Sequence, residues 1–412
     1  MSAALGPLDP DPPPIGASAQ PLKLVTTGPG DKIVLARAVS GIPHSNLDNA
    51  CRVLESSHGD NLWLDQFSGA IKTDWAGGAR KWTDADSIGM AIDLQRNHNL
   101  PKLSVETVHQ AVSAVSSRHA RNECQDWLRG LRWDGRDRLE TALSQGVGCE
   151  DTEYSRAVSR CFFVSMVARV MRPGCKVDTM PVFEGDQGAG KSTALSVIGG
   201  DWYVECHESV LTKDFFGVLD GHMLVEISEM QSFSRAEVNR IKGIVSCLLD
   251  RYRSPYGRFT EDHPRQTVLA GTTNSTDWNR DETGARRFWP IRCDAIDLPW
   301  LRKTRAMLFA EAVHRYDAGQ SWWDVPEALA RAETDARYEG DPWEGPIADF
   351  VTGRDRIRIE IILRDCLKFE IAHQDQMVTK RVGRVLRTLG FERKNARAHA
   401  GGAPEKFWVR TL

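Results

Sequence analysis

The sequence predicts a parallel α/β fold built around a phosphate-binding loop. Residues 185–192 read G-x-x-x-x-G-K-S, after an apolar strand-like run at 180–183 and before a helix-like run at 193–198. Beyond the loop, strand-like and helical runs alternate, as in parallel sheets. We therefore expect an α/β P-loop NTPase core with an N-terminal helical collar and a C-terminal winged-helix-like module.

Length and composition describe an ordinary globular chain of two or three domains. Of its 412 residues, 41% are hydrophobic and 26% are charged. No run of 18 apolar residues and no signal peptide is visible, so we expect no membrane association and a cytoplasmic location, in the host bacterium if the protein is phage-encoded. Nine cysteines without a C-x-x-C pair argue against a zinc site and favour reduced thiols.

The formal net charge of −3 hides an asymmetry along the chain. Residues 351–412 carry 14 Lys and Arg against 7 Asp and Glu, which leaves −10 on the first 350 residues. A basic C-terminal module on an acidic body indicates a polyanionic partner for that module.

The N-terminal half divides by composition. Residues 1–22 are rich in Pro, Gly, Ala and Ser and predict a disordered tail, and residues 23–82 carry short β-like runs. Helical periodicity fills 83–172, with Thr83 and Ser104 as N-caps and further helical regions at 120–143 and 154–171. These helices either pack only, or form a collar that makes subunit contacts. We expect the ATPase core at 173–300, a helical linker at 301–348 and the basic module at 349–412.

The loop residues have the chemistry to bind a nucleoside triphosphate. Backbone N–H groups at the start of a helix attract phosphate oxygens, the Lys191 ammonium neutralises the β- and γ-phosphates, and the Ser192 hydroxyl ligates Mg²⁺. ATP and Mg²⁺ are therefore the expected cofactors. The nucleotide-binding residues are predicted to be Gly185, Asp186, Gln187, Gly188, Ala189, Gly190, Lys191, Ser192 and Thr193.

Hydrolysis also needs a carboxylate beside the metal and the attacking water. The apolar run 223–227 leads to Glu226 and Glu229, of which Glu229 is predicted to activate water and Glu226 to assist the metal or orient Glu229. Both acids are candidate metal ligands. The alternative is that Glu226 pairs with a core arginine and is structural, because a buried carboxylate needs a partner.

Two further elements follow the acids. Asn274 ends the apolar run 267–271 and is predicted to orient the attacking water, although Thr-Thr-Asn is also a common turn. Arg286 and Arg287 precede another apolar run, and one of them is predicted to reach the γ-phosphate of a neighbouring subunit. The alternative for this pair is a surface charge beside a strand.

Two segments have the composition of nucleic-acid contacts. Residues 251–259 interleave arginines with aromatic residues around a Pro-Gly turn, which predicts a β-hairpin that contacts DNA through Arg253, Tyr256 and Arg258, or else a decorated surface turn. Thr379 is expected to cap a helix at 380–389, followed by two basic strands. Such a helix would face a DNA groove with its cations, which are Lys380, Arg381, Arg384 and Arg387.

With these strings in view, the chain resembles the virulence-associated protein E family of phages and prophages, whose members look like superfamily 3 helicases among the AAA+ ATPases. The matching strings are WDGRDRLE at 133–140, EGDQGAGKST at 184–193, LVEISEM at 224–230, DRYRSPYGR at 250–258, TTN at 272–274 and GARRFWPI at 284–291. The resemblance implies that Lys191 and Ser192 form the Walker A pair, that Glu226 and Glu229 are the Walker B acids, and that Asn274 is the sensor. The acids stand as E-x-x-E and are not adjacent, which departs from the family pattern.

We expect a Mg²⁺-dependent ATPase and DNA helicase that functions in phage or mobile-element replication. It is expected to form a hexameric ring and to act on single-stranded and forked DNA. A primase or initiator protein would be its partner, since no primase-like stretch is visible. One alternative is a DNA-binding initiator or regulator that uses ATP only as an assembly switch. The other is a small-molecule phosphotransferase.

Overall fold

The computed structural model describes residues 34–75, 77–253, 260–275, 287–336, 342–370, 376–397 and 404–411. Within them the chain forms two compact units, one built from residues up to 64 together with 71–120 and the other from 65–70 together with residues from 121 onward. The tail expected at 1–22 lies outside the described residues. The boundary expected near residue 82 falls inside the first unit, because the helices on either side of it share one core.

Three helices and a small sheet make up the first unit. The core combines Val53 and Leu54 with Leu94, Val108 and Val112, all of which are buried. Its elements are α1 (Leu47–His58), β1 (Leu62–Asp65), β2 (Ala70–Thr73), β3 (Arg80–Lys81), α2 (Asp84–Asn97) and α3 (Val105–Arg118). The helix α1 was not expected in a region interpreted as β-rich.

The two N-caps read from the sequence are confirmed. Thr83 and Asp86 form a capping box at the start of α2, and the Ser104 hydroxyl accepts a hydrogen bond from the Thr107 amide at 3.0 Å. The apolar residues of α2 that recur at helical spacing are not all buried. Ile88 and Ile92 are 51% and 42% exposed, and the helix instead buries Met90, Ala91 and Leu94.

The second unit begins with α4 (Glu123–Gly130), α5 (Ala142–Val147) and α6 (Glu153–Met171). The long helix α6 is confirmed, whereas the helical region expected at 120–143 is interrupted between α4 and α5. The fully buried Glu311 carboxylate accepts hydrogen bonds from the amides of Arg138 and Leu139, at 2.6 and 3.0 Å. These bonds replace the helical ones and fix the connecting segment as a loop.

A five-stranded parallel sheet forms the centre of the second unit. Its strands are β4 (Met180–Glu184), β5 (Tyr203–Cys206), β6 (Leu224–Ile227), β9 (Val268–Thr273) and β10 (Phe288–Arg292), in the spatial order β10-β4-β9-β6-β5. Each neighbouring pair runs parallel. The molecule therefore has the mixed α/β architecture of nucleotide-binding folds.

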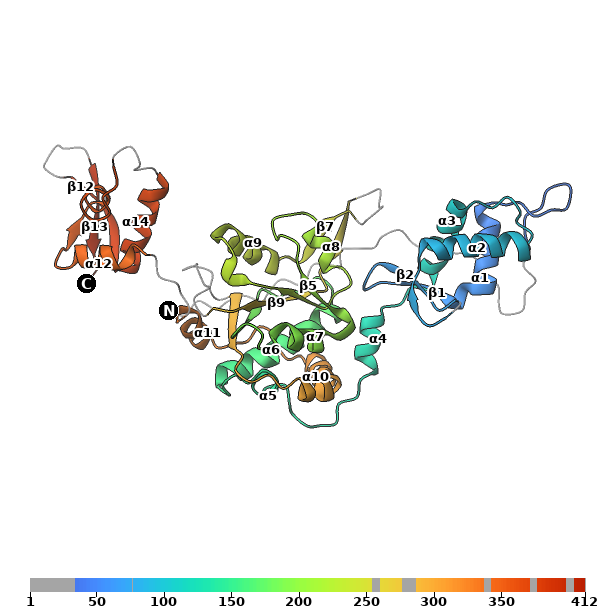
Figure 1. Ribbon diagram of the computed structural model, residues 1–412, viewed down its shortest axis with the longest axis horizontal. Coiled ribbons are helices and arrows are strands. Elements are labelled where there is room, and N and C mark those ends of the chain that lie inside the picture. Colours follow the sequence, from blue (N-terminus) through green and yellow to red (C-terminus); the bar gives the residue numbers. More distant parts are fainter. Residues whose placement is uncertain are drawn as a thin grey trace, which may run out of the picture. The chain divides into compact units, whose positions relative to one another are not determined.

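Helices cover both faces of this sheet (Figure 1). Alternate strand residues point to opposite faces, so Phe183 and Leu224 join one apolar cluster while Val182 and Val225 join the other. On the first face lie α6, α7 (Lys191–Gly199) and α10 (Leu298–Asp317), and on the second lie α8 (Phe215–Leu219) and α9 (Arg235–Val245). Between α10 and the C-terminal segment the chain forms α11 (Glu327–Asp335).

The C-terminal segment has a core of its own, in which Val382, Val385 and Leu386 pack against Trp408. Its elements are α12 (Glu344–Val351), β11 (Arg356–Ile357), α13 (Ile359–Ile361), a π-helical turn (Ile362–Cys366), α14 (Gln376–Thr388), β12 (Phe391–Arg397) and β13 (Pro404–Arg410). The strands form an antiparallel sheet in the order β11-β13-β12. The helix expected at 380–389 thus starts earlier, and Thr379 lies inside it and not at its N-cap.

Candidate nucleotide site

The loop that the sequence predicts to bind phosphate lies at the carboxyl edge of the sheet. It follows β4 directly and ends at Gly190, whose left-handed backbone (φ 92°) turns the chain into α7. At the other end of the loop, Gly185 passes so close to Cys293 that a Cβ atom would lie 2.6 Å from the carbonyl oxygen of that residue. Glycine is therefore required at both ends, and the start of α7 presents its unbonded amides to the space above the sheet.

The Lys191 ammonium ties the loop together. It donates to the carbonyl oxygens of Gly185 at 2.7 Å and Asp186 at 2.9 Å, and to the Asn274 side-chain oxygen at 3.0 Å. Burial lowers the pKa of this lysine from its ordinary value. The lysine and the amide expected to act together at the γ-phosphate are thus in direct contact.

Glu226 lies at the centre of a hydroxyl network. It is fully buried, and its Oε1 accepts hydrogen bonds from Ser192 at 2.7 Å and Thr272 at 2.6 Å. Its Oε2 accepts from the Tyr203 hydroxyl at 2.5 Å. The alternative that Glu226 pairs with a core arginine is wrong, because hydroxyl groups from α7, β5 and β9 satisfy the carboxylate.

Glu229 differs from Glu226 in burial and in backbone. Its side chain is exposed and lines the cavity beside the loop. Its backbone is left-handed, with φ 55° and ψ 41°, which is rare for a residue other than glycine. The turn places the second acid outside the strand, above the buried one.

Asn274 reaches the site because β9 lies between β4 and β6 in the sheet. Glu184 of β4 pairs with Thr273, and Ile227 of β6 pairs with Gly271, so the three strands end together. The backbone N–H of Asn274 donates to the side-chain oxygen of Gln231 at 3.2 Å. The sheet order thus places the amide between the loop and the acids.

These groups surround one cavity of about 340 Å³. All the predicted residues of the loop, the acids and the amide strand that line it come from elements at one edge of the sheet. The lining residues are Gln187, Gly188, Gly190, Lys191, Ser192, Thr193, Glu205, Ser228, Glu229, Thr272, Thr273 and Asn274.

Sequence reasoning missed Tyr203, Glu205 and Thr272. Thr272 lies in a string that was singled out for Asn274 alone, so that signal was present. Tyr203 and Glu205 belong to β5, 12 and 14 residues after Lys191, and only the pairing of Glu205 with Glu226 brings that strand to the acids. Strand pairing of this kind is not readable from local sequence.

Of the two candidate arginines, the structure describes Arg287, which lies away from the cavity. Arg286 is outside the described residues. Arg287 precedes β10, and since Phe288 pairs with Met180, it stands at the amino edge of the sheet, roughly 16 Å from the loop along five residues of strand. There its Nε donates to the Ser246 hydroxyl at 3.0 Å. Arg287 therefore does not join the cavity of its own chain.

The hairpin expected near 251–259 has its two strands. They are β7 (Leu249–Tyr252) and β8 (Glu261–Pro264), an antiparallel pair. Arg253 is exposed just after β7, while Tyr256 and Arg258 lie outside the described residues. A buried ion pair between Asp250 and Arg265 anchors the base, and Arg265 also donates to the Ile244 carbonyl oxygen at 2.6 Å.

The cations of α14 are not equivalent. Lys380 is exposed and Arg384 is half-buried. Arg381 stacks over Trp343, 3.8 Å from the ring centroid, and Arg387 lies 5.4 Å from the ring centroid of Trp408. Two of the four predicted contacts are thus engaged with aromatic rings of their own module.

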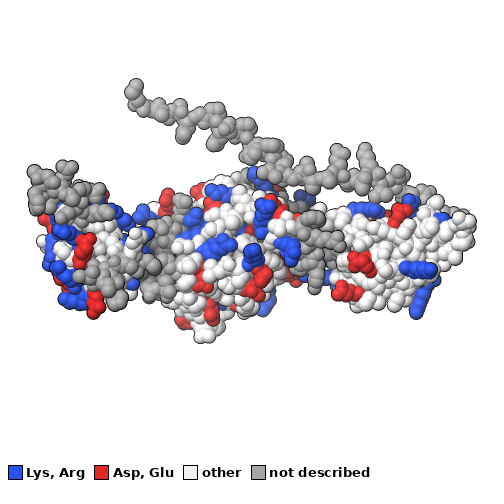
Figure 2. Space-filling model, turned by 90° about the horizontal axis from the view of Figure 1, so that it is seen from above, with Lys and Arg blue, Asp and Glu red and all other residues white. Residues whose placement is uncertain are grey.

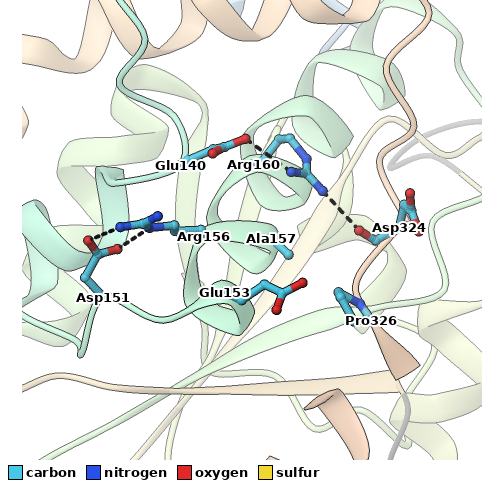
Figure 3. Close-up of a pocket in the computed structure, with 8 residues that line it drawn as sticks. All are labelled: Glu140, Asp151, Glu153, Arg156, Ala157, Arg160, Asp324 and Pro326. Carbon is cyan, nitrogen blue, oxygen red and sulfur yellow. Dashed lines mark hydrogen bonds and ion pairs between the residues drawn. The ribbon is translucent and has the colours of Figure 1, made fainter. Parts of the chain in front are cut away.

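A second hollow, of about 410 Å³, contains opposite charges in pairs (Figure 3). Arg156 pairs with Asp151 at 2.7 Å, and Arg160 contacts Glu140 at 3.3 Å and the Asp324 carbonyl oxygen at 3.1 Å. Because its arginines already have acidic or carbonyl partners, this hollow offers less to an anionic ligand than the cavity at the loop.

Other expectations concern metals, thiols and membranes. Among the described residues, no three His, Cys, Asp or Glu side chains gather as a metal-binding group. The nine cysteines are free thiols. No helix within the described ranges has the length and apolar character needed to cross a bilayer.

Comparison with known proteins places the chain in a family. Curated proteins gave no match. Three solved structures of the NrS-1 C-terminal region, described as apo, resemble this chain. Their sequence identities to it are 12%, 11% and 10%, and their TM-scores are 0.42, 0.43 and 0.48. The matches cover 85%, 85% and 88% of this chain, and 96%, 96% and 99% of the three structures. Likeness at this level supports no inference about the site. The profile of the virulence-associated protein E-like domain matches residues 128–339, just over half of the chain and all of the loop, acid and amide strands. The chain therefore belongs to the virulence-associated protein E-like family.

Proposed function

We propose that this protein is a Mg²⁺-dependent ATPase that moves on single-stranded DNA and unwinds forks as a ring, in the bacterial cytoplasm, during phage or mobile-element replication. The observation that carries the proposal is the convergence of Lys191, Glu229 and Asn274 on one cavity, together with the buried Glu226, which is hydrogen-bonded to the cavity residue Ser192. Membership of the family supports a role in mobile-element replication. DNA unwinding is a more specific proposal than ATP hydrolysis.

The residues at the cavity fit a triphosphate with Mg²⁺. The start of α7 offers amides and Lys191 offers an ammonium, both of which suit phosphate oxygens. The Ser192 hydroxyl and the Glu226 carboxylate lie 2.7 Å apart, and such oxygens are the ligands that Mg²⁺ prefers. The ion, held by them together with phosphate and water, would neutralise charge on the transferred phosphoryl group.

The acids divide the work by their surroundings. Glu226 has its oxygens held by three hydroxyl groups, which suits a fixed metal partner and not a group that must move a proton. Glu229 is exposed to the cavity and would take the proton from the attacking water. Asn274 would orient that water, and Lys191 would exchange its loop carbonyls for phosphate oxygens.

An arginine from a neighbouring subunit would complete the pocket. Arg287 stands at the amino edge of the sheet and cannot serve the loop of its own chain. In a head-to-tail arrangement, that edge of one subunit would face the carboxyl edge of the next, and such interfaces form a ring when the rotation between subunits closes. This geometry supports a ring, and Arg286 is the second candidate for the finger.

DNA contact is assigned to the β7–β8 hairpin and to the C-terminal segment. The exposed Arg253 lies next to the hairpin strands, whose base is fixed by Asp250 and Arg265. In the C-terminal segment, helices followed by strands in the order β11-β13-β12 suit a winged-helix module.

The test compares the purified protein with Lys191→Ala and Glu229→Gln, with and without DNA. Wild-type protein should hydrolyse ATP, Lys191→Ala should neither bind nor hydrolyse it, and Glu229→Gln should bind without turnover. Undiminished turnover in Lys191→Ala refutes the site. A forked substrate then separates the alternatives, because ATP turnover without strand displacement favours the initiator in which ATP only switches assembly. Turnover that neither DNA nor ring formation affects favours the phosphotransferase.

A further inference from the structure

The C-terminal sheet has a charged outer face. Ile357 and Trp408 pair across β11 and β13 and are both 3% exposed in the core of the segment. Because side chains alternate along a strand, the neighbouring residues Arg356, Arg358 and Phe407 lie on the opposite face. This outer face does not include α14, the helix for which the sequence predicts a DNA contact.

Two arginines cover one aromatic ring on this face. The guanidinium carbon of Arg356 lies 3.4 Å from the ring centroid of Phe407, and that of Arg358 lies 5.2 Å from it. Stacking of this kind holds the Arg356 guanidinium flat on the ring and leaves its N–H edges available to an acceptor. The Phe407 ring itself is only 9% exposed, so the arginines and not the ring form the surface.

A lysine extends the row across the sheet. Lys394 of β12 pairs directly with Phe407, on the side away from β11, and is exposed. Within the residues that the structure describes, the side chains of Arg356 and Lys394 have no hydrogen bond or ion pair, apart from the stacking of Arg356 on Phe407. Glu392, which pairs with Val409, is an acid at the same face. Glu405, which pairs with Ala396, stands two positions before Phe407 on β13, so this face carries three cations against two acids.

The spacing suits a phosphate backbone. Arg358 directly follows β11 and Lys394 lies on β12, and β13 lies between these two strands, so about 10 Å separates the two residues across the sheet. Phosphates recur about every 3.4 Å of axis along each strand of duplex DNA, so one stretch of backbone can reach the whole row. Figure 2 shows Lys and Arg side chains spread over the visible face of this segment, at the left of the view.

We propose that the outer face of the C-terminal sheet, defined by Arg356, Arg358, Lys394 and Phe407, binds the phosphate backbone of DNA. Stacked guanidinium groups suit phosphates because their paired N–H donors match two phosphate oxygens. The choice of DNA among polyanions rests on the proposed function, whereas the cationic face does not. Contact through phosphates makes this binding independent of base sequence.

The experiment measures binding of labelled single-stranded and duplex DNA by fluorescence anisotropy, using the full chain without nucleotide, between 50 and 200 mM salt (roughly the range over which phosphate contacts are lost). The double variant Arg356→Gln/Lys394→Gln removes two phosphate contacts. Its affinity should fall roughly tenfold, and its slope of log affinity against log salt should be shallower by about 2. The matched control is Arg364→Gln/Lys368→Gln, which removes the same charge from the π-helical turn and the residues after it and should change both quantities little.

Phe407→Leu tests the contribution of the aromatic ring separately from that of the positive charges. It keeps every cation but removes the ring beneath Arg356, so affinity should fall a few-fold while the salt slope stays unchanged. Circular dichroism melts verify that each variant is folded.

Three outcomes overturn the proposal: unchanged affinity and slope in folded Arg356→Gln/Lys394→Gln, an equal loss in the control, or loss of binding to a polyglutamate peptide with DNA binding intact. The last result would indicate an acidic protein partner. A protein without ATP turnover refutes the proposed function but leaves this measurement valid, since no nucleotide is present.

Discussion

The left-handed backbone of Glu229 allows a quantitative test of its role. With φ 55° and ψ 41°, this residue occupies a region in which a Cβ atom approaches the following carbonyl oxygen. The cost for an L-residue is about 1–2 kcal/mol, and glycine avoids it. Glycine would be the more stable residue here, so the exposed glutamate at this turn accords with the proposed role of its carboxylate.

Replacement by glycine and by alanine separates the backbone from the side chain. Both substitutions remove the carboxylate, but only Glu229→Gly relieves the left-handed strain. Glycine gives back about 0.5–1 kcal/mol through the greater freedom of the unfolded chain. The difference leaves Glu229→Gly more stable than Glu229→Ala by about 0.7 kcal/mol, or roughly a threefold change in the folded-to-unfolded ratio.

The assay is urea unfolding of both variants, followed by tryptophan fluorescence, together with ATP binding and turnover. We expect both variants, and Glu229→Gln, to bind ATP without hydrolysing it. Equal stability of the alanine and glycine variants would refute the strain argument. Turnover in Glu229→Gln would refute the assignment of Glu229 as the base, whatever the stability result.

Three further predictions address other parts of the second unit. Tyr203→Phe removes the hydrogen bond to Glu226 Oε2. We expect the Mg²⁺ concentration for half-maximal ATP turnover to rise several-fold while metal-free nucleotide binding is unchanged. An unaltered Mg²⁺ requirement would contradict the idea that Tyr203 positions the Glu226 carboxylate. Gly271→Ala introduces a methyl group that overlaps the Met230 sulfur and lies 3.3 Å from Val182, so the free energy of unfolding should fall by about 1–3 kcal/mol in urea titrations; a stable variant would show that this side of the sheet repacks freely. Burial and the charge of Arg287 lower the pKa of Lys242 to about 8 from its ordinary value of 10.5. The protonated lysine therefore destabilises the fold fully below pH 8 and progressively less up to pH 10.5. Lys242→Met should stabilise the fold at pH 7, with a gain that shrinks as the pH rises from 8 to 10.5, and a gain that is constant with pH would count against the lowered pKa.

Much of the nucleotide site is predictable because it depends on local patterns. The loop at Lys191 needs only glycines between a strand and a helix, and the position of Glu229 follows from where an apolar strand ends. The caps at Thr83 and Ser104 are similarly local, since each side chain satisfies an amide three residues ahead. These features depend on neighbours in the chain.

The remaining features depend on residues far away in the sequence. The interruption between α4 and α5 arises because Glu311, more than 170 residues later, accepts the amides of Arg138 and Leu139. Tyr203 joins the site through pairing of β5 with β6. Thr379 has the residue type of an N-cap, but α14 begins before it, and no local signal distinguishes a threonine at a cap from one inside a helix.

In the proposed ring, the position of Arg287 at the edge of the sheet opposite the loop has a consequence for assembly. A row of protomers joined through these two edges always leaves one terminal protomer with ATP but no donated guanidinium. When the ring closes, this terminal pocket also receives a guanidinium from its neighbour. The last subunit to join therefore activates a pocket in another subunit, although it brings no type of residue that the other subunits lack. ATP turnover per subunit should then depend steeply on protein concentration. Dilution should abolish turnover even in pockets that retain all the residues of their own chain.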